Sequence, residues 1–221
     1  MAVIALIMAS GVSVSLVAAR ILWTGHWRYA FLAWNLFLAW LPLLFAQISC
    51  DAFRQPSRAK WRFWGFAVAW LLFFPNAPYI FTDIIHLNTR GFGHFWLDLV
   101  LVLLCALTGL VLGFVSLFLM QSVIRQMLGK AASWIFIAIV AGLSGFGIYL
   151  GRFLGFNSWD IVWKPLELSR GIGDWVSDPL GHPTSFVFPW LFGTFLFVAY
   201  VMLYALTRLQ PGQQLHLQTT K

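Results

Sequence analysis

The sequence LVLVLLCALTGLVLGFVSLFLMQSVI, residues 99–124, contains no charged residue and exceeds the roughly 20 helical residues that cross a bilayer core. Similar apolar stretches recur on both sides of it. None alternates as barrel strands do, and backbone groups in lipid must be hydrogen-bonded within the segment. We therefore predict an all-α fold, a polytopic membrane helical bundle with six transmembrane helices at about residues 2–20, 29–50, 63–83, 95–122, 132–153 and 186–207.

The composition indicates the same class of protein. Of the 221 residues, 61% are hydrophobic and only 10% are charged, which is more apolar surface than one soluble core can bury. Residues 1–221 are expected to form a single integral membrane domain in contact with the lipid bilayer. The net charge of +7 is attributed to basic cytoplasmic loops, and no nucleic-acid partner is expected.

The basic residues also predict an orientation. Six helices place both termini on one face, and that face carries eight lysines and arginines against six on the other. It includes a compact basic cluster from Arg54 to Arg62. Because short basic loops stay cytoplasmic, we expect both termini in the cytoplasm. No basic residue precedes the first span and Arg20 follows it, which is unlike a cleaved signal peptide, so this span is expected to be retained.

The longest hydrophilic segment, residues 155–185, is expected to hold an interfacial helix between the fifth and sixth spans. The pair Asn157 and Ser158 can cap a helix that begins at Trp159, after which apolar and charged residues are mixed. We expect this helix to break near Pro165 and to end at one of the glycines at positions 171 and 173.

Glycines spaced four apart occur in two of the predicted spans. They are Gly109 and Gly113 in the fourth span, and Gly147, Gly151 and Gly155 in the fifth. Such spacing lets helix backbones approach closely. It favours a tight pairing of the fourth and fifth helices.

The third span ends in FFPNAPYIFTDIIHL, residues 73–87, where polar side chains interrupt an apolar helix. Asn76, Tyr79, Asp83 and His86 fall within an arc of about 80° on one helical face. Prolines at positions 75 and 78 remove backbone donors, so the helix should kink or open there. A carboxylate at membrane depth costs about 2.5–3.5 kcal/mol, which favours a polar site over a plain capped kink for the set as a whole.

A second polar pair follows across a short link. His94 and Asp98 lie at the start of the fourth span, opposite Asp83 and His86 of the third. Two carboxylates and two histidines are ligands that suit a divalent metal such as zinc or manganese. The spacing permits a metal without requiring one, since these side chains near a membrane surface are more often hydrogen-bonded or solvated, and no metal ligand is assigned.

Arg152 is the basic residue expected to meet this site. It shares one face of the fifth helix with Tyr149, and we expect it to form an ion pair with Asp83 or Asp98. The alternative is an anion site, because a guanidinium beside a capped helix start suits a phosphate, a carboxylate or a lipid head group.

Direct signs of covalent catalysis are absent from the sequence. It contains no nucleophile motif, nucleotide-binding loop or zinc-hydrolase motif. If the site is catalytic, Asp83 and His86 are the candidates for acid and base, with Arg152 and Asn76 stabilising charge.

Three motifs resemble a known family. PNAPYIFTDIIHL at 75–87, FWLDL at 95–99 and GIYLGRFLGFNSWDI at 147–161 are similar to those of bacterial multipass membrane proteins called Domain of Unknown Function 1361. The resemblance implies a bacterial inner-membrane location but no established activity. It also implies a shared site made of Asn76, Tyr79, Thr82, Asp83, His86, Asp98, Arg152, Asn157, Trp159 and Asp160.

Three functions remain open at this point. The first is a membrane-embedded enzyme acting on a lipid or lipid-linked anionic substrate at the outer leaflet. The second is a small transporter or channel for protons, ions or a small solute, and the third is a scaffold without a ligand. We favour the first because the opposite half of the membrane region is almost entirely apolar, with Asn35, Gln47 and Gln121 as the main exceptions.

Overall fold

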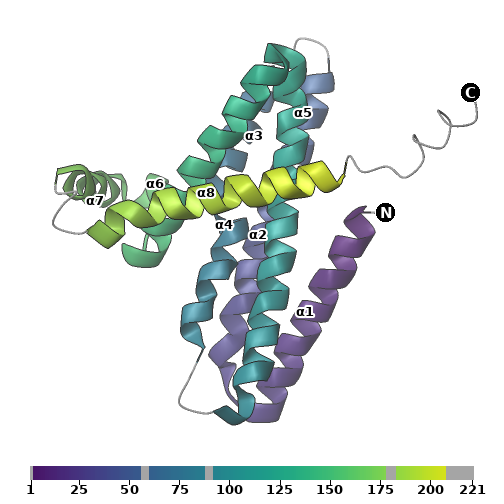
Figure 1. Cartoon of the computed structure of the whole chain (residues 1–221), viewed down its shortest axis with the longest axis vertical. Helices are drawn as coiled ribbons and strands as arrows, with labels where there is room; N and C mark the ends of the chain where they lie inside the picture. Colours follow the sequence, from purple (N-terminus) through teal and green to yellow (C-terminus); the bar gives the residue numbers. More distant parts are fainter. Residues whose placement is uncertain (1, 56–59, 88–91, 178–182, 208–221) are drawn as a thin grey trace, which may run out of the picture.

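The computed structural model describes residues 2–55, 60–87, 92–177 and 183–207, and within these ranges it contains helices and no β-strand (Figure 1). The predicted all-α fold class is therefore confirmed. The elements in chain order are α1 (Ala2–Thr24), the 3-10 helix η1 (Trp27–Tyr29), α2 (Ala30–Arg54), α3 (Lys60–Phe73), α4 (Asn76–Tyr79), the 3-10 helix η3 (Ile80–His86), α5 (Phe92–Phe153), α6 (Asp160–Trp163), α7 (Pro165–Ser177) and α8 (Pro183–Leu206).

Five helical stretches in the described part of the chain are long and apolar enough to cross a membrane. They are Val3–Thr24, Ala30–Arg54, Trp61–His86, Phe95–Phe153 and Val187–Leu206. The fourth combines two of the six predicted spans, because α5 is helical over 62 residues apart from one reversal. The protein is thus a multi-pass membrane protein built from long apolar helices.

Gly129 is the point at which α5 reverses. Its φ of 91° and ψ of 178° are not helical, and a side chain rarely accepts that φ. We call residues 92–128 the first arm and residues 130–153 the second arm of α5. Figure 1 shows the two arms meeting at one end of the molecule, where the predicted loop between the fourth and fifth spans lies.

The helices pack in two apolar clusters. In one, Leu32 and Leu36 of α2 are buried against Val102 and Ala106 of the first arm. In the other, residues of α3, both arms and α8 surround Trp70, which is only 1% exposed. The indole N–H of Trp70 donates to the hydroxyl of Ser116 at 3.1 Å, so the largest core side chain has its polar atom satisfied.

The third predicted span is broken at its prolines. The α-helical part α3 ends at Phe73, α4 is a single turn, and η3 continues as a 3-10 helix to His86. The carbonyl of Phe74 accepts the N–H of Ala77 at 3.1 Å, so the break keeps this backbone group hydrogen-bonded. We call residues 75–79 the broken segment.

Glycines from both arms of α5 contact the broken segment. A Cβ placed on Gly109 of the first arm would lie 2.7 Å from the carbonyl oxygen of Ala77. A Cβ on Gly147 of the second arm would lie 2.8 Å from Pro75 Cγ, and one on Gly151 would lie 3.1 Å from the ring of Tyr79. The glycine stripes therefore receive the broken segment between the arms, whereas the sequence favoured contact between the two helices themselves.

A Gly109→Ala variant is expected to be less stable than the native protein by about 1–3 kcal/mol, because the new methyl group meets a backbone carbonyl that cannot move independently. The measurement is the thermal unfolding midpoint in detergent. Gly65→Ala is the matched control, since no atom lies within 4 Å of a Cβ at that α3 position. Equal loss of stability in both variants would contradict this packing.

Helix α8 crosses the other long helices instead of running beside them (Figure 1). It contacts α5 where Gly193 faces the second arm, and a Cβ on Gly193 would lie 3.1 Å from the carbonyl oxygen of Ala141. Farther along α8, the hydroxyl of Tyr200 donates to Gln121 Oε1 of the first arm at 2.6 Å. A close backbone crossing and one buried hydrogen bond thus fix α8 to both arms.

The segment between α5 and α8 contains the expected short helices. The helix breaks before Pro165, as predicted, but α7 continues to Ser177, past both glycines that were expected to end it. Trp175 of α7 packs on Phe146 of the second arm, with ring centroids 4.9 Å apart. This contact holds α7 against the end of α5.

Candidate functional site

Arg152, in the last turn of the second arm, extends its guanidinium to η3. Nε and Nη2 donate to Thr82 Oγ1 at 2.9 and 2.6 Å, and Nη2 also donates to Asp83 Oδ1 in an ion pair. The Tyr79 ring covers the guanidinium, with its centroid 4.4 Å from Arg152 Cζ. The sequence left Asp83 or Asp98 as the ion-pair partner of Arg152, and in the structure Arg152 pairs with Asp83.

The carboxylate of Asp83 is almost completely buried, with 1% of the residue exposed. Its second oxygen, Oδ2, accepts the side-chain N–H of Asn35 from α2 at 2.8 Å. The sequence reasoning placed Asn35 in the apolar opposite half and therefore missed it. The available signal was topological, because the second helix begins on the face where the third helix ends, which brings Asn35 level with Asp83.

His86 completes the ring of polar groups around Arg152. Its Nε2 lies 3.0 Å from Arg152 Nη1, and its ring meets Phe31 edge-on at 5.1 Å between centroids. A guanidinium can only donate hydrogen bonds, so this contact requires Nε2 to be the unprotonated ring nitrogen. His86 is exposed, in contrast to Asp83.

The segment after Arg152 folds back over the broken segment. Asn76 donates through Nδ2 to the carbonyl of Phe73 at 3.1 Å and to Ser158 Oγ at 3.0 Å. The backbone N–H of Asn157 donates to Asp160 Oδ2 at 2.6 Å. The side chains of Asn157 and Ser158 do not cap α6, contrary to the prediction, because Ser158 is engaged with Asn76 and the carboxylate of Asp160 closes the turn.

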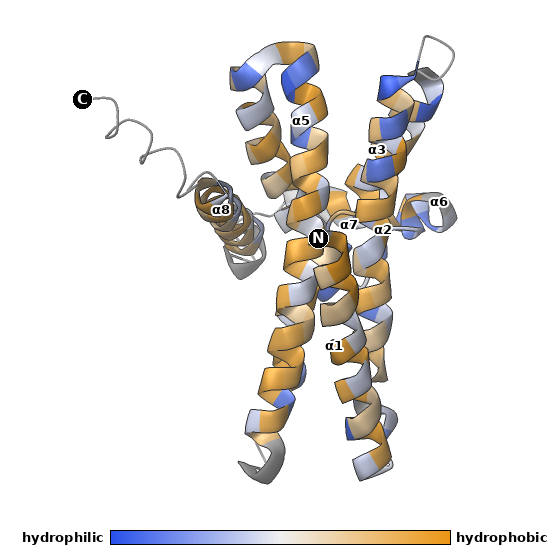
Figure 2. Ribbon diagram, turned by 90° about the vertical axis from the view of Figure 1, so that its right-hand side faces the viewer, coloured by the Kyte–Doolittle hydropathy of each residue, from blue (hydrophilic) through white to orange (hydrophobic). Residues whose placement is uncertain are grey.

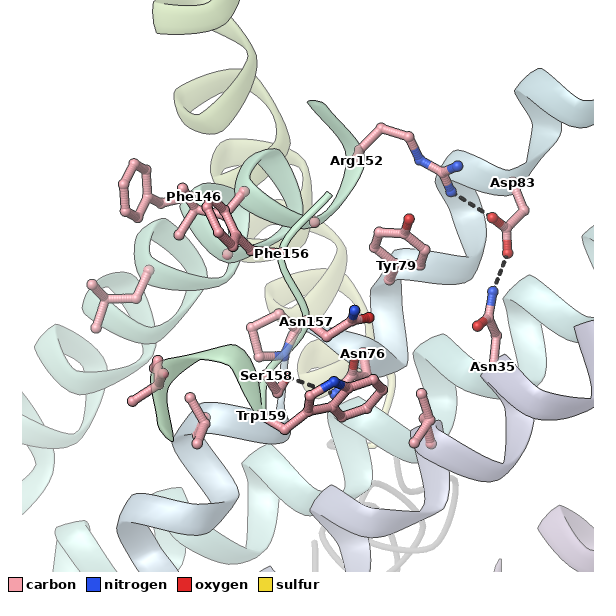
Figure 3. Close-up of a pocket in the computed structure, with 18 of the residues that line it drawn as sticks. Asn35, Asn76, Tyr79, Asp83, Phe146, Arg152, Phe156, Asn157, Ser158 and Trp159 are labelled. Carbon is pink, nitrogen blue, oxygen red and sulfur yellow. Dashed lines mark hydrogen bonds and ion pairs between the residues drawn. The ribbon is translucent and has the colours of Figure 1, made fainter. Parts of the chain in front are cut away.

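A cavity of about 1070 Å³ lies between these elements (Figure 3). Its walls come from α2, α3, α4, η3, the second arm and the segment from Phe156 to Ile172. Most of the lining is apolar, and the polar lining residues are Asn35, Asn76, Tyr79, Asp83, His86, Arg152, Asn157 and Ser158, with Trp34 and Trp159 contributing indole groups.

Seven of the eleven predicted site residues line this cavity. They are Asn76, Tyr79, Asp83, His86, Arg152, Asn157 and Trp159. Thr82 and Asp160 do not line it and instead hold Arg152 and Asn157 in place. Tyr149 is buried among aromatic rings, 5.3 Å from that of Phe153, and also lies outside the lining.

Asp98 belongs to a separate polar cluster that the sequence did not predict. Arg20 of α1 donates to both of its carboxylate oxygens, at 2.6 and 3.2 Å. The hydroxyl of Tyr29 donates to Asp98 Oδ2 at 2.8 Å. Asp98 was expected beside Asp83 and Arg152, but the structure gives it an arginine of its own and leaves it outside the cavity lining.

The positions of the two carboxylates in the structure bear on the divalent metal site that the residue spacing in the sequence permits. Asp83 and Asp98 are each paired with a different arginine. No group of three or more histidine, cysteine or acidic side chains suited to a metal occurs in the described ranges. The side chain of His94 lies outside the described residues, so the four-residue set that includes it stays a prediction.

Fold and site together define a polytopic helical membrane protein with a cavity beside a broken transmembrane helix. The chain belongs to the family described as Protein of unknown function (DUF1361), whose family model matches residues 34–200. This range runs from α2 to α8 and contains all the residues that line the cavity except Phe31. The resemblance predicted from the three motifs is therefore confirmed. No curated protein and no solved structure matches the chain.

Proposed function

We propose that this protein binds a lipid or lipid-linked molecule in the cavity, at the extracytoplasmic leaflet of a bacterial inner membrane. The observation that carries the proposal is the division of the cavity lining. Leu71, Leu72 and Phe146 contribute apolar wall, whereas Arg152 and His86 mark a polar end. An amphipathic molecule has the same division, and a cavity of this volume suits a ligand of drug size or larger.

Access from the bilayer supports a lipid in particular. Val68 and Leu143 line the cavity while remaining 65% and 49% exposed on the surface. Both belong to helices long and apolar enough to cross a membrane, so their exposed faces meet acyl chains. A lipid can thus enter sideways without leaving the hydrocarbon, so its acyl chains need not be exposed to water on the way.

The position of the polar end supports the outer leaflet. Figure 2 shows hydrophilic residues where α5 reverses and where α3 begins, and Arg125 and Lys130 lie at that reversal. The second arm separates Lys130 from Arg152 by about 33 Å at a rise of 1.5 Å per residue. This is close to the hydrocarbon thickness of about 30 Å. A cytoplasmic basic end therefore places Arg152 near the opposite boundary.

Reporter fusions test this orientation. A phosphatase reporter joined after Trp175 is expected to be active, and the same reporter joined after Lys60 is expected to be inactive, because short basic loops stay cytoplasmic. A reporter that works only in the cytoplasm should give the reverse pattern. Signals from the same side at both positions would contradict the proposed orientation.

Lipid occupancy tests the proposed function itself. We expect lipid to co-purify with the native protein, detected by native mass spectrometry, and to be at least tenfold depleted in a Leu72→Trp variant whose larger side chain obstructs the apolar wall of the cavity. Leu191→Trp is the matched control, since Leu191 is 68% exposed on α8 and does not line the cavity. Equal occupancy in the two variants, each with a normal unfolding midpoint, would overturn the proposal.

A catalytic function is the second candidate, and His86 is the observation that favours it. Its imidazole is exposed and lines the polar end of the cavity, where a group that exchanges protons could reach a bound lipid. Asp83 is held by Arg152 and Asn35, so we assign it to positioning Arg152 and leave proton exchange to His86. His86→Gln should then stop conversion of the bound lipid, seen as a mass change, while the lipid still binds.

A further inference from the structure

We infer that the cavity accepts an uncharged, hydroxyl-rich head group, such as a sugar or another polyol, in preference to a phosphate. This inference rests on the proposed lipid-binding function and specifies the chemistry of the bound molecule. It departs from the anionic ligand that the sequence suggested for Arg152. The argument depends on which polar groups of the lining are already used inside the protein and which remain available.

The charged groups of the cavity are used internally. Arg152 donates four hydrogen bonds, two to Thr82 and one each to Asp83 and His86, out of the five that a guanidinium can make. Its side chain is only 10% exposed, and Tyr79 covers one face. The adjacent Asp83 carboxylate balances its charge. An entering phosphate would therefore find a neutralised arginine with a single N–H to offer.

The neutral groups of the lining are largely available. Within the described residues, the side-chain amide of Asn157, the indole N–H of Trp159 and the hydroxyl of Tyr79 make no hydrogen bond. Asn76 uses Nδ2 for both of its bonds, which leaves its carbonyl oxygen Oδ1 as an acceptor. Figure 3 shows Tyr79 between Arg152 and Asn76, with Asn157 and Trp159 next to Asn76.

This mixture of donors and acceptors suits hydroxyl groups. A hydroxyl both donates and accepts, so it can bond Asn76 Oδ1 as well as the Trp159 N–H. A phosphate dianion only accepts, so it could not bond Asn76 Oδ1, which stays turned outward because Asn76 Nδ2 is bound to Phe73 and Ser158. The rings of Trp159 and Tyr79 also provide flat apolar surfaces for the C–H faces of a sugar.

Lipids that differ only in their head group test the inference. The full chain is purified in a polyoxyethylene ether detergent, because alkyl glycosides would occupy the site. Glucosyl dioleoylglycerol, dioleoyl phosphatidic acid and dioleoylglycerol are then titrated and followed by native mass spectrometry. We expect the glucosyl lipid to bind at least tenfold more tightly than either of the others.

Each outcome decides a separate question. Preference for phosphatidic acid, or equal binding of all three lipids, would overturn the inference while leaving lipid binding intact. Absence of binding by all three would overturn the proposed function. Free glucose that competes as strongly as the glucosyl lipid would support the head-group chemistry and overturn the requirement for a lipid.

A substitution of one lining residue links the preference to the cavity. Trp159→Phe keeps an aromatic ring but removes the indole N–H, and it is expected to weaken binding of the glucosyl lipid by about threefold to tenfold. Binding of phosphatidic acid should change less. Trp163→Phe is the matched control, because Trp163 is 77% exposed and does not line the cavity. Unchanged affinity in Trp159→Phe would contradict a role for this donor.

Discussion

An Arg152→Ala variant is expected to lose about 3–5 kcal/mol of stability, the range for removing one partner of a buried ion pair. Asp83 is 1% exposed and, among the described residues, would retain only Asn35 as a polar side-chain partner. Thr82 would lose both of its hydrogen bonds from the guanidinium. The unfolding midpoint in detergent, followed by circular dichroism, and the amount of protein in the membrane should both fall.

A second substitution separates the lost charge balance from the lost contacts. Adding Asp83→Asn to Arg152→Ala removes the buried charge that has no counterion, so the double variant should be more stable than Arg152→Ala alone. Arg62→Ala is the control, because this exposed arginine of α3 should affect stability by no more than about 0.5 kcal/mol. Normal stability of Arg152→Ala together with lost lipid binding would instead assign Arg152 to the ligand.

The broken helix and its partner illustrate what the sequence can predict. Two prolines within FFPNAPY necessarily remove backbone donors, and the structure breaks the helix at that point. A buried carboxylate needs a counterion, and Asp83 and Arg152 lie at the C-terminal ends of the third and fifth predicted spans, which the predicted topology puts on the same face. The proline rule acts over one or two turns, so the helix break can be predicted before any packing is known.

Partner choice across the bundle depends on information that the sequence does not contain. The predicted topology puts Asp83 and Asp98 near the same membrane face, together with both Arg20 and Arg152. Which arginine meets which carboxylate depends on where α1 packs. In the structure α1 packs against the first arm of α5, with Val17 buried. This packing brings Arg20 beside Asp98, and the two side chains form an ion pair.

The glycine stripes show the same limit in backbone packing. A spacing of four indicates that some backbone comes close, but it does not say which one. In the structure the backbone and side chains of the broken segment fill this role, at Ala77 for Gly109 and at Pro75 for Gly147. Because its backbone turns at two prolines, the broken segment is compact enough to lie between the two arms of α5.

The second ion pair is expected to matter chiefly for α1. Only 17% of the apolar window of α1 is buried, so few side chains besides Arg20 attach this helix to the bundle. An Arg20→Ala variant should lose about 3 kcal/mol, the lower end of the range for buried pairs. The lower value is expected because Arg20 Nη1 has no hydrogen-bond partner among the described residues, so the native pair is itself incompletely satisfied.

Hydrogen exchange in detergent distinguishes this local effect from the global one expected for Arg152. In Arg20→Ala, amide exchange should accelerate in α1 and change little in α5 and α8, because α1 can detach without opening the contact between those two helices. Tyr29→Phe removes one hydrogen bond to Asp98 and should cost about 1 kcal/mol with the same pattern. Faster exchange throughout the bundle in Arg20→Ala would show instead that α1 is required for the whole fold.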